Sequence, residues 1–268
     1  VATTLSKSTI PRLVTMIGST NTGRRVIADS STSIKKLSME LGGNAPFIVF
    51  DDADFEAALD LAIGIKFGNS GQICVAANRF FIHKNIFDSF LKAYVERVNK
   101  IKLGFGKNEK VDMGPLINFQ ARKRIMNLVK DAVNNGAHVE TGGNIPEKFK
   151  KGYWLEPTVL SNVNSKMKIY KEEIFGPVAC IMSFDHENEV LTLANDTKYG
   201  LASYLFTKDK DRIEYFSKNL DFGEVQVNGI KYAIYLPHGG VKDSGLGHDC
   251  SHYALEDYLS KKRVSIAI

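Results

Sequence analysis

The sequence predicts an α/β fold, and two observations support that prediction. Short apolar runs that suit buried strands alternate along the chain with segments whose apolar residues recur at helical spacing. Glycine, aspartate and asparagine stand where these segments end, as turn residues do. The 268 residues, 44% hydrophobic and 24% charged, are enough to bury a large core in one or two domains.

The first elements read strand, polar turn, helix. Residues 13–17 (Leu-Val-Thr-Met-Ile) form a short apolar strand that Gly18-Ser19-Thr20 breaks, and a helix is expected over 21–30. Further strands are expected over 37–41, which ends at two glycines, and over 47–50, which Asp51-Asp52 closes.

Amphipathic helices dominate the next part. Residues 53–67 carry apolar side chains at helical spacing, and Asp51, Asp52 and Asp54 stand at the start, where the helix dipole favours anions. The same spacing predicts the other helices, and short apolar runs predict strands; these segments are helices at 87–101, 119–135, 187–195 and 209–219, and strands at 178–184, 204–207 and 224–228. The tail, 264–268, alternates weakly and is a candidate edge strand.

Composition narrows the function classes. The net charge of +5 comes from 35 basic and 30 acidic residues scattered along the chain, so no nucleic-acid partner is expected. No apolar stretch approaches the roughly 20 residues that cross a bilayer, and no signal pattern precedes the first strand, so we expect no membrane partner and a cytoplasmic location. The chain starts at Val1 in what resembles the middle of an amphipathic segment, so we expect a fragment or a processed product.

Three cysteines, Cys74, Cys180 and Cys250, are widely spaced and lack Cys-x-x-Cys pairs, so no metal site is expected. Cys74 ends the run Gly-Asn-Ser-Gly-Gln-Ile-Cys, in which a tight glycine turn would present the thiol to a ligand. A buried, inert thiol is the alternative for Cys74. Cys180 lies inside an apolar strand and is expected in the core, whereas Cys250 is left undecided.

Two carboxylates are candidates for chemistry. Glu40 ends an apolar strand against two glycines, where partial desolvation would suit a general base. Glu172 and Glu173 precede Ile174-Phe175-Gly176-Pro177, and this segment would place one of the two carboxylates on a ribose diol and the aromatic side chain against a ring. A solvated strand end and a capping turn are the respective alternatives.

The turn from Gly18 to Gly23 opens a helix, whose free N–H groups attract phosphate. An N-cap without any ligand would carry the same residues.

Taken together, these segments resemble the aldehyde dehydrogenase superfamily, from about Val14 to the C-terminus. The resemblance rests on ordered motifs: Ile-Gly-Ser-Thr with Gly23, Met-Glu-Leu-Gly-Gly at 39–43, Gly-Gln-Ile-Cys at 71–74 followed by Asn-Arg, Glu-Glu-Ile-Phe-Gly-Pro at 172–177, Tyr-Gly-Leu-Ala at 199–202, Val-Asn at 227–228, and Gly-Gly-Val-Lys at 239–242 with Ser-Gly. It implies a three-layer α/β catalytic domain with a mostly parallel sheet, beside a remnant of a Rossmann-like nucleotide-binding domain.

The resemblance also implies roles and boundaries. Cys74 would attack an aldehyde and Glu40 would activate water to hydrolyse the thioester. NAD or NADP would contact Gly18, Ser19, Gly23, Leu41, Glu173 and Phe175, while Asn228 and His238 would border the substrate. The expected parts are the nucleotide-binding remnant (1–41), the catalytic domain (42–248) and an arm (249–268) that joins a homodimer or homotetramer.

Two departures from the family pattern matter. Segments that supply most of the Rossmann sheet, the adenosine ribose contacts and an oxyanion-hole asparagine are not in this sequence, so we expect the chain alone to bind cofactor poorly and to turn over slowly or not at all. His238 stands where many members carry Phe, either as a more polar tunnel wall or as a structural hydrogen-bonding group.

The substrate class remains open between related activities. The segments 41–54 and 76–79 resemble succinate-semialdehyde dehydrogenases, whereas 237–240 and 253–258 resemble aminoaldehyde enzymes. A coenzyme A-acylating dehydrogenase and a non-catalytic assembly module are the alternatives from other classes. The choice between NAD and NADP is also open.

Overall fold

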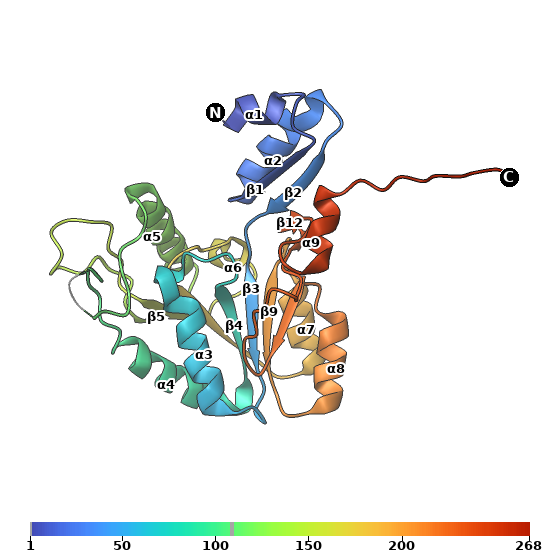
Figure 1. Ribbon diagram of the computed structural model, residues 1–268. Helices are drawn as coiled ribbons and strands as arrows, with labels where there is room; N and C mark the ends of the chain where they lie inside the picture. The colour runs from blue at the N-terminus through green and yellow to red at the C-terminus, as the bar shows by residue number, and fades with distance from the viewer. Residues whose placement is uncertain (1, 108–109) are drawn as a thin grey trace.

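A computed structural model describes residues 2–107 and 110–268 (Figure 1). Its largest sheet has seven strands in the order β10-β9-β3-β4-β7-β6-β5. Six of them run parallel, and β5 pairs antiparallel with β6 at one edge. The strands are β3 (Ala45–Val49), β4 (Ala77–His83), β5 (His138–Thr141), β6 (Thr158–Ser161), β7 (Val178–Phe184), β9 (Ala202–Phe206) and β10 (Glu224–Val227).

Helices cover both faces of this sheet and make three layers (Figure 1). Successive side chains of a strand point to opposite faces, so Phe47 and Val49 of β3 pack with α3 and α4, whereas Ile48 and Phe50 pack with α5 to α8. The helices are α3 (Phe55–Phe67), α4 (Phe87–Val98), α5 (Phe119–Asn134), α6 (Lys168–Lys171), α7 (Glu187–Asn195) and α8 (Lys210–Asn219). The expected three-layer α/β fold with a mostly parallel sheet is confirmed.

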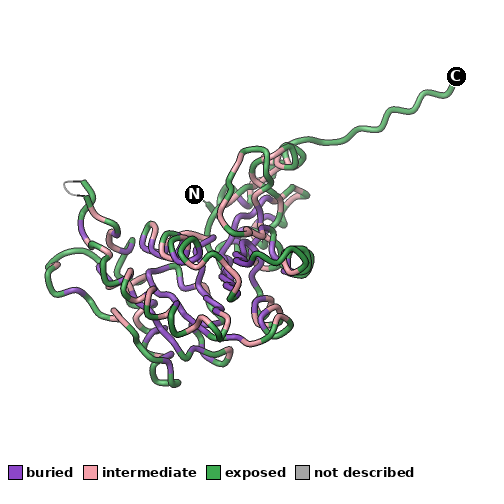
Figure 2. The backbone as a smooth tube through the Cα atoms, turned by 90° about the horizontal axis from the view of Figure 1, so that it is seen from below, coloured by how far each residue is buried: buried purple, intermediate pink, exposed green. Residues whose placement is uncertain are grey.

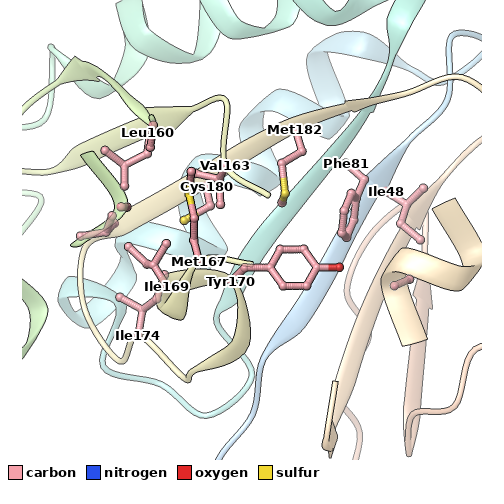
Figure 3. Close-up of a cluster of buried hydrophobic side chains, with 14 of the residues drawn as sticks. Ile48, Phe81, Leu160, Val163, Met167, Ile169, Tyr170, Ile174, Cys180 and Met182 are labelled. Carbon is pink, nitrogen blue, oxygen red and sulfur yellow. The ribbon is translucent and has the colours of Figure 1, made fainter. Parts of the chain in front are cut away.

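The core lies between these layers. Buried backbone concentrates in the centre of the molecule, as Figure 2 shows, and every residue of β3 and β9 is buried. Figure 3 shows one of the three apolar clusters, in which Cys180 lies among Leu160, Ile169 and Met182. Cys180 is fully buried, so its expected place in the core is confirmed, and burial raises the pKa of its thiol to about 12.

A smaller sheet stands above one end of the large one. It has the order β1-β2-β12, with β1 (Leu13–Ile17) parallel to β2 (Lys36–Glu40), and α1 (Ala2–Lys7) and α2 (Thr20–Asp29) beside it. β12 (Gly245–Leu246) pairs antiparallel with β2, and a third, two-stranded sheet joins β8 (Tyr199–Gly200) to β11 (Val241–Lys242). The late part of the chain therefore completes the sheet that the first 41 residues begin.

The C-terminal segment contains a helix that the sequence analysis did not predict. α9 (Ser251–Tyr258) lies against the small sheet, where the Lys36 ammonium donates to the carbonyls of Glu256 and Leu259, at 3.0 and 2.7 Å. Only the residues after Leu259 extend away from the body (Figure 1). In the described part of the chain, residues 264–268 pair with no strand, because nothing in the same molecule lies beside them.

Apart from the candidate strand at 264–268, the predicted helices and strands appear with shifted ends. The sequence predictions omit the helices α1, α6 and α9 and the strands β4, β5, β6, β8, β11 and β12. β4 carries Arg79, a residue that breaks an apolar run, yet Arg79 is fully buried. Its guanidinium donates to the carbonyls of Asn44, Leu193 and Ala194 and lies over the ring of Tyr170. A buried arginine is tolerated because carbonyls at the end of α7 and in the β2–β3 link accept its hydrogen bonds.

Lys66 of α3 is also fully buried, and it contacts the start of β4. Its ammonium donates to the side-chain oxygen of Asn78 at 2.9 Å. Burial lowers the pKa of Lys66 from 10.5 to about 7, since desolvation penalises the charged form.

Lys66→Met should therefore change how stability depends on pH. Below a pH of about 7, the pKa of Lys66 in the folded protein, the buried ammonium is charged and lowers the stability of the wild type by its full desolvation cost. As the pH rises from about 7 towards 10, Lys66 loses its proton in the folded protein and this cost disappears. The wild-type free energy of unfolding should thus rise relative to Lys66→Met over this range, by at most about 1.4 kcal/mol per pH unit. Urea denaturation at pH 7 and 9.5 measures it.

The matched control is Lys92→Met, on the exposed side of α4. It should leave the pH slope of the wild type unchanged. Equal slopes in wild type and Lys66→Met would contradict the assignment.

Candidate active site

Cys74 follows a loop that only small or polar residues can form. Asn69, Ser70 and Gly71 all have left-handed backbone angles, with φ of 49°, 59° and 68°. The hydroxyl of Ser70 donates to the carbonyl of Gly114, and the side chain of Gln72 accepts from the Ile117 N–H. These bonds hold the loop, and Cys74 is left half-buried with its thiol free.

Glycines let the backbone of this loop approach its neighbours. A Cβ on Gly71 would lie 2.3 Å from the Gly176 carbonyl oxygen, and a Cβ on Gly43 would lie 2.2 Å from the Cys74 carbonyl oxygen. Both separations are too short for any side chain. The glycines of two sequence motifs therefore seat the cysteine loop against the β2–β3 link and the start of β7.

Glu40 is the last residue of β2 and is buried. Its backbone carbonyl accepts from the Gly18 N–H at 2.9 Å, and its carboxylate lies 3.3 Å from Nε2 of His238. The sequence-predicted base therefore faces His238, a residue that was predicted to border the substrate.

His238 is the most perturbed of these groups. Its Nδ1 forms a close ion pair with Glu224, the first residue of β10. Hydrogen bonds to Cys74, Glu224 and Glu40 raise the pKa of His238 to about 12, against the opposing effect of burial. Sequence reasoning missed Glu224, because a polar residue at a strand start carries no signal that distinguishes it from a solvated one.

Two phenols complete this side of the site. The hydroxyl of Tyr204 donates to the Val75 carbonyl at 2.8 Å, and the ring of Tyr232 lies edge-on to His238. Burial raises the pKa of both tyrosines, so both stay neutral.

A cavity of about 500 Å³ opens on the other side of Cys74. It is lined by residues from four of the sequence motifs: Ile17, Gly18, Ser19, Leu41, Gly42, Gln72, Ile73, Cys74, Glu173 and Phe175. Gly18, Ser19, Leu41, Glu173 and Phe175 were all predicted to contact a cofactor. The structure brings these five together, at one cavity that Cys74 also borders.

Glu173 is held in place at this cavity. Its carboxylate accepts from the Gly43 N–H at 2.9 Å, while Arg124 donates to the backbone carbonyls of Glu173 and Ile174. Burial raises the pKa of Glu173, and the Gly43 bond opposes that shift. A Cβ on Gly42 would lie 2.6 Å from this carboxylate, so the glycine leaves room for it.

The turn before α2 serves two purposes. Ser19 caps the helix, since its hydroxyl accepts from the Thr22 N–H at 3.3 Å, which the N-cap alternative describes. Ser19 and Gly18 also border the cavity. Gly23 does not: a Cβ there would lie 2.6 Å from the Leu41 side chain, so this glycine packs α2 on β2 instead of facing the cavity.

Asn228 is not brought to this site. It follows β10 at the carboxyl end of the parallel strands, whereas Cys74 and Glu224 lie at their amino ends. Its carboxamide accepts from the Thr207 N–H and donates to the Thr207 carbonyl, at 3.1 and 2.8 Å. Both polar groups are thus used to join the ends of β9 and β10, which corrects its expected place beside the substrate.

The remaining predictions about sites concern metals and membranes. In residues 2–107 and 110–268, no group of three or more His, Cys, Asp and Glu side chains is arranged to hold a metal ion. Over the same ranges, no helix combines the length and the apolar character that crossing a bilayer requires.

Comparison with known proteins agrees with the motif order. The model of the aldehyde dehydrogenase family matches residues 1–264. The chain is 44% identical to succinate-semialdehyde dehydrogenase [NADP(+)] 1 of Schizosaccharomyces pombe, over 98% of this chain and 53% of that protein. It is 40% identical to an NADP(+) succinate-semialdehyde dehydrogenase of Escherichia coli, over 100% of this chain and 55% of that one. The chain spans about half the length of these relatives.

Solved structures show the same fold. A betaine aldehyde dehydrogenase from Staphylococcus aureus in complex with NAD+ superposes with a TM-score of 0.94 at 37% identity, over 97% of this chain and 52% of that one. An E. coli NADP-dependent enzyme superposes with a TM-score of 0.93 at 40% identity, over 97% and 54%.

Gly71→Ala should destabilise the cysteine loop. A methyl group would meet the Gly176 carbonyl and the backbone would keep a φ that alanine disfavours, so the free energy of unfolding should fall by about 2 kcal/mol or more. Gly64→Ala is the matched control, because Gly64 lies in α3 with nothing within 4 Å of a new Cβ. It should raise stability by about 0.5–1 kcal/mol. Chemical denaturation of both variants compares them, and equal effects would refute the close approach.

Proposed function

This chain belongs to the aldehyde dehydrogenase family, and from that premise we propose that its protein oxidises a short aldehyde, succinate semialdehyde foremost, to the carboxylic acid with NAD or NADP. One observation carries the proposal: the half-buried Cys74 borders the same cavity as the residues expected to contact a cofactor, with Glu40 nearby behind His238. The named activities of the similar proteins support the choice of substrate and cofactor.

The cavity fits part of a dinucleotide. Gly18 and Gly42 present bare backbone to it, Leu41 and Phe175 give it apolar surface, and Glu173 supplies a carboxylate that suits ribose hydroxyls. The Ser19 turn adds the N-terminus of α2, which favours a phosphate. NAD or NADP, when bound there, accepts a hydride from the carbon attached to sulfur.

The chain's own residues would carry the other steps. The Cys74 thiolate adds to the aldehyde carbon and forms a C–S bond, while the carbonyl electrons move to oxygen; the Cys74 backbone N–H donates to that oxyanion. Once the carbon is oxidised to a thioester, Glu40 takes a proton from water as the water attacks. The C–S bond then breaks, the thiolate returns and the acid leaves.

Substitution of Cys74 and Glu40 tests these roles in the full-length gene product. Cys74→Ser should lower turnover by about a thousandfold or more, because a hydroxyl is a far weaker nucleophile. Glu40→Gln should slow steady-state turnover but keep the first, rapid formation of NADH or NADPH, because acylation precedes the step that needs the base. Absorbance at 340 nm follows both, with succinate semialdehyde beside an aminoaldehyde.

Cys250→Ser provides the control, since Cys250 is exposed and is not among the residues that line the cavity. It should keep wild-type turnover. Full activity in Cys74→Ser would remove the basis of the proposal, and a preference for the aminoaldehyde would change its substrate.

We also propose, in line with the predicted arm, that the C-terminal tail joins copies of the chain into a dimer or tetramer. Val264, Ile266 and Ile268 alternate and are exposed by 75%, 81% and 121%. A strand of this kind suits addition to the edge of another molecule's sheet. We also propose that the protein is located in the cytoplasm.

Deleting residues 260–268 should reduce the mass measured by light scattering to that of one chain, because the segment proposed to join the copies is lost. The chain itself should stay folded, because the contacts of α9 within the molecule remain. Replacing Lys261 and Lys262 by alanine, which keeps the alternating apolar residues, is the control and should keep the assembly. An unchanged mass after the deletion would exclude the tail as the joining element.

A further inference from the structure

Ser244 is a fully buried serine that connects three of the sequence motifs, 39–43, 199–202 and 239–245. Its hydroxyl donates to the Gly42 carbonyl at 2.6 Å and accepts from the Gly200 N–H at 2.9 Å. Its backbone carbonyl accepts from the Leu41 N–H at 2.8 Å. Gly42 and Gly200 are both buried, so loss of the hydroxyl would leave a buried acceptor and a buried donor without their partner.

These bonds lie where the small sheet meets the rest of the molecule (Figure 1). Directly after Ser244, β12 pairs with the end of β2, and Gly245 stands opposite Glu40. Just before Ser244, β11 pairs with β8, which ends at Gly200 and leads into β9 of the large sheet. Ser244 therefore ties the end of β2 to the chain that enters the large sheet.

The place of Glu40 depends on both neighbours of β2. On one side its carbonyl accepts from the Gly18 N–H at 2.9 Å, next to β1 of the same small sheet. On the other side lies β12, where a Cβ on Gly245 would be only 2.1 Å from the Met39 carbonyl oxygen. Cys74, by contrast, lies just before β4 of the large sheet. The expected base and nucleophile thus belong to different sheets, and the junction between the sheets helps to set their separation.

We propose that Ser244 is a positioning residue, which holds Glu40 at the end of β2 within reach of the thioester formed on Cys74. The inference rests on the proposed function for the step that it serves, the attack of water. Ser244 acts through Glu40 and touches no reacting atom. A small misplacement of the base slows the reaction steeply, because proton transfer requires hydrogen-bond distance.

The first measurement uses the full-length gene product with saturating aldehyde and cofactor. Ser244→Ala should lower steady-state turnover about tenfold or more, because the base is displaced. It should keep the first, rapid formation of NADH or NADPH, since that phase precedes the step that needs the base. Absorbance at 340 nm after rapid mixing follows both phases.

A double variant separates positioning from general damage. In Glu40→Gln the base is already absent, so adding Ser244→Ala should slow steady-state turnover by a further factor of about two or less. A merely structural role of Ser244 would instead make the two losses multiply.

Thr158 provides a matched control in β6, near the β5 edge of the large sheet. It is fully buried, and its hydroxyl donates to the Glu156 carbonyl and accepts from the Gly143 N–H, both at 2.8 Å. Thr158→Val removes the same kind of hydrogen-bond pair as Ser244→Ala and nearly keeps the volume of the side chain. It should keep wild-type turnover in both phases.

The second measurement needs neither aldehyde nor cofactor. Gly18 is exposed and its N–H donates to the Glu40 carbonyl, so amide hydrogen exchange at Gly18 reports whether Glu40 keeps its place. Mass spectrometry of the peptide that contains Gly18 measures this exchange. Ser244→Ala should make it about tenfold faster, whereas Thr158→Val should leave it unchanged.

Ser244→Cys serves if the alanine variant fails to fold, which circular dichroism reports. A thiol fills nearly the same place but is a weak donor and a weak acceptor. Turnover and Gly18 exchange should therefore change in the same direction as in Ser244→Ala, but by less.

Unchanged exchange at Gly18 would overturn the inference, as would losses that multiply in the double variant of an active enzyme. Loss of the first, rapid phase in Ser244→Ala would overturn it too, because the damage would then extend beyond the base. Faster exchange at Gly18 in a wild-type background that oxidises no aldehyde would count against the proposed function alone.

Discussion

The parallel pairing of β3 with β4 is the constraint on which the site depends. It aligns Ala45 with Ala77 and so places the link before β3 beside the loop before β4. The two backbones then approach so closely that Gly43 has no room for a Cβ against the Cys74 carbonyl. Residues about thirty positions apart in sequence are therefore in contact because the two strands point the same way.

That approach also organises both sides of Cys74. The Gly43 N–H donates to Glu173 and thereby fixes the carboxylate at the cavity, while the residue three positions earlier, Glu40, faces His238. One short segment at the end of β2 therefore contributes both to the cavity expected to bind the cofactor and to the group of residues expected to act in catalysis. Cys74, Glu40 and Glu173 therefore lie at the amino ends of the parallel strands of the large sheet and not at their carboxyl ends.

Buried charge explains why the other side of Cys74 is so ordered. The carboxyl groups of Glu40 and Glu224 are both buried, and the imidazole of His238 lies between them and contacts both. Arg79 and Lys66 follow the same rule elsewhere, since each buried cation has its own acceptors.

The sequence by itself determined the α/β class, most helices and strands, and the types of residue that could act at Cys74, Glu40 and Glu173, because periodicity and turn residues are local properties of a chain. It did not indicate β4, whose apolar run is broken by Arg79, nor that Glu224 faces His238. Only the tertiary structure decided which polar residues meet. Strand direction and order place Glu224 at the same end of the sheet as Cys74 and carry Asn228, four residues later, to the opposite end, and no local pattern encodes which strands become neighbours.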